Sequence, residues 1–236
     1  MRNGRPTVRY MSTLRAVLIV GAGPRLGGAI ARRFAQDNRP IGLISRSQPG
    51  VEALAASLRD QGATVASATA DAGEIAALQA AIATLRDRIG DFGVAIHNVS
   101  TGGETAATDL APEQLLAEFA GGTASLLTVA RAVAPGMAAA GGGTIIATGS
   151  GMADTASPLA PSLSMQKAGL RLLVKALAPG LAEQCVHCAM VTVKGMIAKG
   201  TAFDPGQIAE AYAELVAQTD GPRESWQTVK VYTGER

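Results

Sequence analysis

Short apolar runs alternate with longer segments of helical periodicity along almost the whole chain. The first run, residues 15–20 (RAVLIV), stops at a glycine, and residues 26–37 then place apolar side chains at 26, 30 and 34. A short buried run followed by a helical period is typical of a strand that leads into a helix. On this pattern we expect strands at 15–20, 41–45, 65–68, 94–97, 144–148, 186–193 and 228–232, and helices at 26–37, 51–61, 74–89, 112–139, 162–183 and 205–218.

This alternation predicts a single α/β domain. Strands that alternate with helices form a parallel sheet with helices on both faces. Right-handed crossovers then make a three-layer, doubly wound fold of the Rossmann type. The 236 residues suit one domain, and neither a repeat nor a linker divides them. We therefore expect a flexible tail at 1–13 and one domain over 14–236; two glycines and a proline interrupt its long helical segment at 112–139.

Composition argues against several classes of partner. The net charge is only +2 and no long run of one sign occurs, so we expect no nucleic-acid surface. No apolar stretch reaches the roughly 18 residues of a membrane span, so we expect no membrane insertion. Cys185 and Cys188 are spaced as C-x-x-C, but they lie in an apolar segment without a second ligand pair. Buried strand cysteines are the favoured interpretation, and reduced cysteines fit a cytoplasmic protein.

The first strand-to-helix turn reads VGAGPRLGGAI and predicts a phosphate site. A glycine-rich turn at this place lets backbone N–H groups and the helix N-terminus face a pyrophosphate. The simple G-x-G-x-x-G pattern is broken. Gly21 and Gly23 match its first two glycines, but Leu26 occupies the position of the third. Gly27 follows directly. We expect this turn to bind a dinucleotide cofactor.

The end of the second strand favours a phosphorylated cofactor. A site for NAD(H) usually carries an acid there for the ribose hydroxyls. This chain instead has Ser45 and Arg46. Arginine suits a 2′-phosphate through charge-assisted hydrogen bonds. We therefore expect NADP(H) to be preferred, with NAD(H) still possible; a solvated arginine at a strand end is the alternative interpretation.

Taken together, the motifs resemble those of the short-chain dehydrogenase/reductase family over roughly residues 14–197. In the family's T-G-x-x-x-G-x-G turn, Gly21 and Gly27 match and Arg25 replaces the middle glycine. Asp71 matches the acid that contacts the adenine in the family, and Asn98 matches the second asparagine of the N-N-A-G motif. The resemblance implies an oxidoreductase that binds a nicotinamide cofactor and acts on a small-molecule substrate.

The family's catalytic set is incomplete in this chain. Ser150 matches the catalytic serine, and Lys167 matches the lysine of Tyr-x-x-x-Lys. Leu163 stands in place of the tyrosine, and Gly122 in place of the family's helix asparagine. In the family, the tyrosine exchanges the proton on the substrate oxygen, the serine orients that oxygen, and the lysine tunes the tyrosine and binds the nicotinamide ribose.

The loss of the tyrosine predicts atypical or weak activity. Leu163 has no exchangeable proton, and positioned acid–base catalysis is worth about 10²–10⁴ in rate. No register shift restores the motif, because the other tyrosines are Tyr10, Tyr212 and Tyr232. Tyr212 is expected in the core or an interface. The alternative is a non-catalytic cofactor-binding sensor or scaffold protein.

Several residues near these motifs have open roles. Arg25 is expected to cover the cofactor phosphates, to reach the 2′-phosphate, or to obstruct the site. Either serine beside Leu163 is expected to cap the following helix or to face solvent. His97 is expected either to pack at the strand end or to relay a proton, and Asp154 is a candidate replacement acid. Lys194 is expected to be a solvated lysine or a cofactor contact.

The resemblance also implies a homodimer or homotetramer. Family members often pair the helices that correspond to 112–139 and 162–183. Small residues in the first of these, at 121, 122, 124 and 125, would allow two helices to approach closely. Trp226 is expected to anchor the C-terminal segment or a neighbouring subunit.

Overall fold

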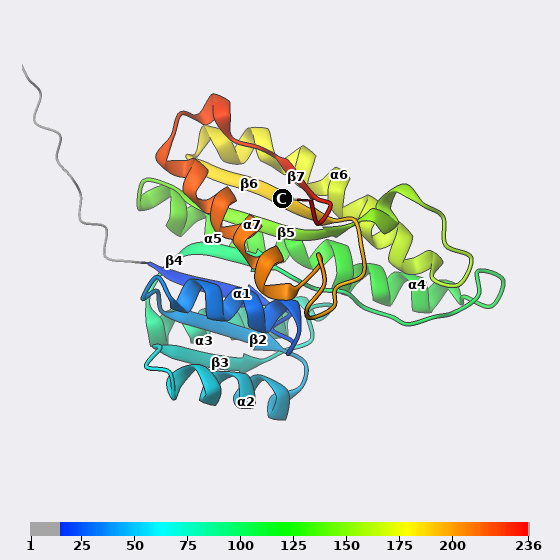
Figure 1. Cartoon of the computed structure of the whole chain (residues 1–236), viewed down its shortest axis with the longest axis horizontal. Helices are drawn as coiled ribbons and strands as arrows, with labels where there is room; N and C mark the ends of the chain where they lie inside the picture. The colour runs from blue at the N-terminus through cyan, green and yellow to red at the C-terminus, as the bar shows by residue number, and fades with distance from the viewer. Residues whose placement is uncertain (1–14, 236) are drawn as a thin grey trace, which may run out of the picture.

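The computed structural model describes residues 15–235 and has the expected three-layer architecture. The tail expected at 1–13 lies outside the described residues. A seven-stranded sheet has the order β3-β2-β1-β4-β5-β6-β7, and every neighbouring pair of strands is parallel (Figure 1). The strands are β1 (Ala16–Val20), β2 (Ile41–Ser45), β3 (Val65–Thr69), β4 (Phe92–His97), β5 (Gly143–Ser150), β6 (Val186–Val193) and β7 (Val229–Tyr232).

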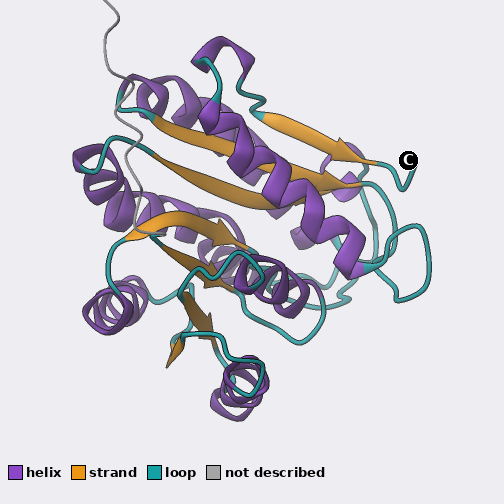
Figure 2. Cartoon of the chain, turned by 60° about the vertical axis from the view of Figure 1, so that its left-hand side comes forward, coloured by secondary structure: helices purple, strands orange, loops and turns teal. Residues whose placement is uncertain are grey.

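Helices cover both faces of this sheet (Figure 2). One face carries α1, α2 and α7, whose buried side chains form one hydrophobic cluster with the strands; α3, α5 and α6 form a second cluster on the other face. Both clusters are mostly aliphatic, as the composition requires. The helices are α1 (Leu26–Ala35), α2 (Gln48–Arg59), α3 (Ile75–Ile89), α4 (Pro112–Phe119), α5 (Ser125–Ala139), α6 (Pro161–Glu183) and α7 (Pro205–Ala217).

The strand order reverses direction between β1 and β4, and this positions the site. The chain builds β2 and β3 on one side of β1, then crosses to build β4, β5 and β6 on the other. The loops that leave β1 and β4 therefore diverge at the carboxyl ends of these strands. In open α/β sheets this divergence leaves a crevice in which ligands bind.

The long helical segment predicted at 112–139 is divided in the structure. A π-helical turn, Ala120–Ala124, separates α4 from α5, and it contains the two glycines that were expected to interrupt the segment, Gly121 and Gly122. Such turns insert one extra residue and often occur at functional sites. Pro135, expected to interrupt the helix, stays inside α5. Helix α2 begins three residues before its predicted start, because Ser47 caps it by accepting from the Gly50 N–H.

The two cysteines are not both in a strand. Cys188 is buried in β6, as expected, and burial raises the pKa of its thiol to about 12. Cys185 precedes β6 in a turn and is only half-buried, with φ of 61°. No metal-binding cluster of His, Cys, Asp and Glu occurs within residues 15–235. Among the described helices, none is both long enough and apolar enough to cross a membrane.

Candidate cofactor-binding and catalytic site

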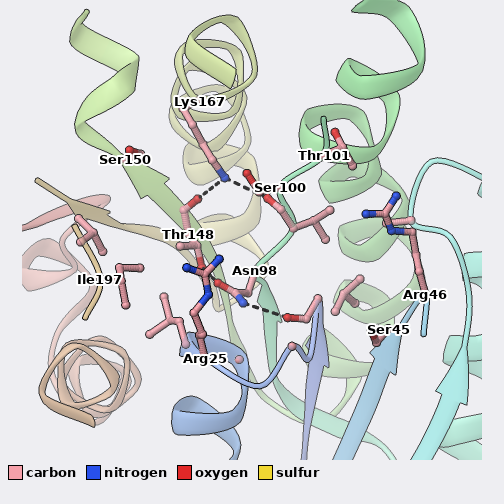
Figure 3. A pocket seen from close by; sticks show the side chains of 18 of the residues that line it. Arg25, Ser45, Arg46, Asn98, Ser100, Thr101, Thr148, Ser150, Lys167 and Ile197 are labelled. Atoms are coloured by element: carbon pink, nitrogen blue, oxygen red, sulfur yellow. Dashed lines mark hydrogen bonds between the residues drawn. The ribbon is translucent and has the colours of Figure 1, made fainter. Parts of the chain in front are cut away.

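A cavity of about 510 Å³ lies at the carboxyl ends of the central strands (Figure 3). It extends from the ends of β2 and β3, past the turn after β1, to the ends of β5 and β6. All the site residues predicted from the sequence line it: Gly21, Gly23, Arg25, Leu26, Gly27, Ser45, Arg46, Asp71, Asn98, Ser150 and Lys167. The fold thus gathers residues from six segments of the chain around one cavity.

The turn after β1 is built around a close backbone contact. Gly21 has φ of 87°, and a Cβ at this position would overlap the Asn98 carbonyl oxygen and lie 2.6 Å from its carbon. A larger residue therefore does not fit. The Asn98 side chain also binds this turn, because its Nδ2 donates a hydrogen bond to the Gly21 carbonyl at 2.9 Å. Helix α1 then begins at Leu26 without a side-chain cap. The Gly28 N–H donates to the Gly23 carbonyl at 2.7 Å, and the N–H groups of Leu26 and Gly27 remain available to an anion.

Arg46 occupies the far end of the cavity, at the end of β2. Its side chain is 63% exposed, and its Nη1 lies 4.0 Å from the nearer Asp71 oxygen. The other Asp71 oxygen accepts from the Gly73 N–H at 2.8 Å. A contact this long between exposed groups contributes little. The Arg46 guanidinium therefore remains available to a phosphate.

Arg25 lies in a different part of the cavity from Arg46. Figure 3 shows its guanidinium between Asn98 and Ile197, well separated from Arg46 and Ser45. Among the described residues its side chain has no hydrogen bond or ion pair. This position suits contact with the middle of a bound dinucleotide, and it argues against a shared role with Arg46.

Lys167 is buried in the cavity wall near the end of β5. Its Nζ donates to the Val99 carbonyl at 3.0 Å and to the Thr148 carbonyl at 3.2 Å (Figure 3). An ammonium group has three N–H donors, so one remains for a ligand. Burial lowers the pKa of Lys167 to about 8, within reach of neutral pH.

The position expected to carry a proton donor is apolar. Leu163, one helical turn before Lys167, lines the cavity, and no described tyrosine does. Tyr212 is fully buried, as expected; its hydroxyl lies 2.7 Å from Thr148 Oγ1, and burial raises its pKa. Tyr232 donates to the Ala202 carbonyl. Tyr10 lies outside the described residues.

Ser150 both lines the cavity and starts the turn that follows β5. Its hydroxyl lines the cavity and also accepts from the Met152 N–H at 3.2 Å, where a short helical turn begins. The turn-forming interpretation and the substrate-orienting one are therefore compatible, because the serine O–H still has its own proton to donate.

Gln166 is the residue that sequence reasoning missed. It is completely buried, and its amide makes four hydrogen bonds, three of which tie α6 to Thr101 in the loop after β4. Its Oε1 accepts from the backbone N–H and the hydroxyl of Thr101, while its Nε2 donates to the Thr101 carbonyl and to Ser162. A Cβ at Gly122 would overlap Gln166 Oε1 and lie 2.6 Å from Cδ. The Gln166 amide therefore occupies the room that a side chain at 122 would need.

Thr148 is a second residue without a sequence signal. Its hydroxyl lies between Tyr212 and the Asn98 side chain, and it donates to Asn98 Oδ1 at 2.9 Å. Asn98 is thereby held at both ends of its amide, by Thr148 and by the Gly21 carbonyl. This fixes the cavity wall beside Lys167.

The capping prediction for the two serines is wrong. Helix α6 begins at Pro161 after Ala160, so Ser162 and Ser164 lie inside the first turns and both are buried. Proline at the first helical position sets this start. Ser162 instead accepts from Gln166, and Ser164 from the Ser157 N–H.

The three remaining charged or titratable candidates are engaged elsewhere. His97 is fully buried with Nε2 2.7 Å from Ser125 Oγ; burial and then the Lys167 charge lower its pKa to about 3, so it stays neutral. Asp154 pairs with Arg171 at 2.5 Å and with Lys194 at 3.1 Å. These partners hold the Asp154 pKa below its usual value, which argues against Asp154 as a proton donor at neutral pH.

The family model described as short chain dehydrogenase matches residues 15–203. Among curated proteins, "Dehydrogenase/reductase SDR family member 4" from Bos taurus is 29% identical over 176 residues, which cover 73% of this chain and 62% of the relative. The "(2S)-[(R)-hydroxy(phenyl)methyl]succinyl-CoA dehydrogenase subunit BbsC" of Thauera aromatica is 30% identical over 170 residues, 70% of this chain and 65% of the relative. The chain thus spans less than two thirds of the length of either relative.

Solved structures show the same fold at lower identity. A short chain dehydrogenase from Mycobacterium smegmatis superposes with a TM-score of 0.83 at 22% identity, covering 94% of both chains. A metagenomic short-chain oxidoreductase in complex with NADP superposes with a TM-score of 0.81 at 22% identity, covering 92% of this chain and 96% of that one.

Proposed function

The chain belongs to the short-chain dehydrogenase family of oxidoreductases, and from that premise we propose that it binds NADP(H) in preference to NAD(H) and carries out hydride transfer with atypical or weak activity. The observation that carries the preference is Arg46, exposed at the end of β2 with no firm carboxylate partner. The NADP complex of a structural neighbour is consistent with this choice.

The cavity residues fit such a cofactor. The uncapped first turn of α1 and the turn Gly21–Gly27 would hold the pyrophosphate, with Arg25 above it. Ser45 and Arg46 would hold the 2′-phosphate, with Asp71 beside the adenine. At the other end, Asn98 and the free N–H of Lys167 would face the place where the nicotinamide ribose and the substrate oxygen meet.

When bound, the cofactor supplies or accepts a hydride. The protein must orient the substrate oxygen and exchange its proton. The Ser150 hydroxyl would orient that oxygen by donating a hydrogen bond. With Leu163 unable to give a proton, Lys167 is the group with both the position and the lowered pKa to give one, directly or through one water molecule. Such a route differs from the family's tyrosine mechanism, and slow turnover is expected.

The second candidate function is a cofactor-binding protein without catalysis, such as a sensor or scaffold. Leu163 is the observation that favours it, because an apolar side chain lines the cavity where a proton donor is needed. The test is a hydride-transfer assay with NADPH over aldehydes, ketones and quinones, alongside direct cofactor titration. Turnover supports the oxidoreductase. Cofactor binding without turnover of any of these substrates supports the sensor or scaffold.

We also propose that the protein forms a homo-oligomer through α4 and α6. No side chain of helix α4 is fully buried within the chain. Leu116 on α4 and Leu172 on α6 are 70% and 67% exposed, and their burial against a second copy would remove apolar surface from water. A dimeric or tetrameric mass in light scattering at micromolar concentration is expected; a monomeric mass would contradict it.

A further inference from the structure

A second cavity, of about 410 Å³, lies at the amino ends of the strands. It is bounded by the residue before β1, the starts of β4 and β5, the turn before β6 and the end of α7. No residue of the cofactor cavity lines it, because the two cavities lie at opposite ends of the sheet. Nothing in the proposed function uses it.

The lining of this second cavity is positively charged. Arg15, Arg39 and Arg223 come from three separate segments, and Asp220 is the one carboxylate among the described lining residues. Within residues 15–235, none of these three arginines forms an ion pair. Several other arginines, such as Arg33, do form ion pairs with nearby carboxylates. Arg15 and Arg39 are half-buried, and they therefore lack the anions that such arginines usually pair with.

Backbone carbonyls and a thiol accept hydrogen bonds from only some of the N–H groups of these arginines. Arg15 Nη2 donates to the Gly142 carbonyl at 2.5 Å, Arg39 Nη1 to the Arg15 carbonyl at 3.3 Å, and Arg223 Nη2 to Cys185 Sγ at 2.8 Å. Arg15 Nη1 and Trp226 Nε1 are buried without any partner among the described residues. A buried N–H without an acceptor is rare and costly, and an unaccounted ion or ligand is one of its ordinary explanations.

Nearby carboxylates offset only part of this positive charge. Burial lowers the pKa of Arg39 and the charge of Arg15 lowers it further; Asp37 and Asp220 raise it, but the pKa remains below its usual value. Residues 1–14, which lead directly into Arg15, contain neither aspartate nor glutamate. An external anion would relieve the repulsion and satisfy the free donors together.

We propose that this second cavity binds a small molecule carrying several oxyanion oxygens, a phosphate ester or a polycarboxylate, held by Arg15, Arg39 and Arg223. Planar guanidinium forks match carboxylate and phosphate oxygens in a bidentate manner. Trp226 adds an N–H donor and an apolar wall. The site is independent of the cofactor cavity, and occupancy would tie together the strand starts and the segment that carries Arg223.

The test is calorimetric titration of the full chain with inorganic phosphate and, separately, with citrate, in saturating NADPH and again without cofactor. One ion binds per chain. Arg39→Met and Arg223→Met each weaken binding about tenfold or more, as expected when a charged hydrogen bond is lost. Arg131→Met, which removes the same charge from the exposed face of α5, leaves it unchanged. Tighter binding of phosphate identifies a phosphate ester, and tighter binding of citrate a polycarboxylate.

Two results would overturn the proposal: no saturable heat with either anion, or equal weakening in all three variants, which would indicate diffuse charge attraction. NADPH affinity measured on the same variants stays unchanged, so failure of this site and failure of the proposed function are separable. Arg223 is exposed and lies in a short turn, so its variant remains informative even if Arg39→Met does not fold.

Discussion

A side chain at position 122 is expected to destabilise the protein, although glycine is normally a poor helix residue. Replacing glycine by alanine inside an exposed helix stabilises it by about 1 kcal/mol. In Gly122→Ala, however, the new methyl group would overlap the Gln166 side chain, whose Cδ and Cγ lie 2.6 and 3.0 Å away. Gln166 is buried and cannot move without breaking its hydrogen bonds to Thr101 and Ser162.

The magnitude follows from those bonds. Four hydrogen bonds at a net of about 0.5–1.5 kcal/mol each give about 2–6 kcal/mol, against about 1 kcal/mol gained from the helix propensity of alanine. A net loss of about 3 kcal/mol lowers the melting temperature of a domain of this size by about 6–12 °C. Calorimetry and urea denaturation of Gly122→Ala measure this loss.

A matched control and a double variant make the reasoning refutable. Gly180 lies in α6, and a Cβ there would meet nothing within 4 Å, so Gly180→Ala should stabilise slightly. In the double variant Gly122→Ala/Gln166→Ala the overlap is gone, and the combined loss should be smaller than the sum of the single losses by more than about 1 kcal/mol. A neutral Gly122→Ala, or strictly additive losses, would refute the claim that the two residues share one space.

Three further predictions concern the site. Leu163→Tyr should raise the rate of hydride transfer by about 10²–10⁴ if position 163 is where a proton donor is missing, and an unchanged rate in the assay would count against that alignment. Because the pKa of Lys167 is lowered to about 8, the rate of hydride transfer should fall as pH rises through about 8, and a flat pH–rate profile would exclude Lys167 as the donor. The free energy of unfolding should rise between about pH 8 and 10.5, because the unfolded state binds more protons than the folded state in that range. The His97 pKa of about 3 means that urea midpoints should drop as pH falls from 6.5 towards 3, since only the unfolded state takes up that proton, and His97→Gln should flatten this part of the curve.

Much of the fold was readable from the sequence because buried parallel strands appear as short apolar runs. The predicted bounds of β2 and β6 agree with the structure residue for residue. Errors arose where local chemistry sets an end. Ser47 starts α2 early by capping it, and Pro161 starts α6 before the serines that were expected to cap it. Serine at the cap and proline at the first helical position are local signals that apolar periodicity does not register.

The predicted site residues also gather in one cavity, because residues at strand ends of a parallel sheet meet at one edge. The contact between Gly122 and Gln166 could not be predicted from the sequence in this way. A glutamine within a helix looks solvent-facing in one sequence, and only the crossing of α6 with the π-helical turn makes it buried. The second cavity was equally hidden, since Arg15, Arg39 and Arg223 are far apart in the chain and meet only in the fold.

The central claim is that this chain binds NADP(H) through Arg46, and side-by-side titration of NADPH and NADH tests it most directly. We predict saturable NADPH binding at least about tenfold tighter than NADH binding, from the charge-assisted bonds to a 2′-phosphate. Arg46→Met should remove that difference and leave NADH affinity unchanged. Equal affinity for the two cofactors, or no binding of either, would contradict the account.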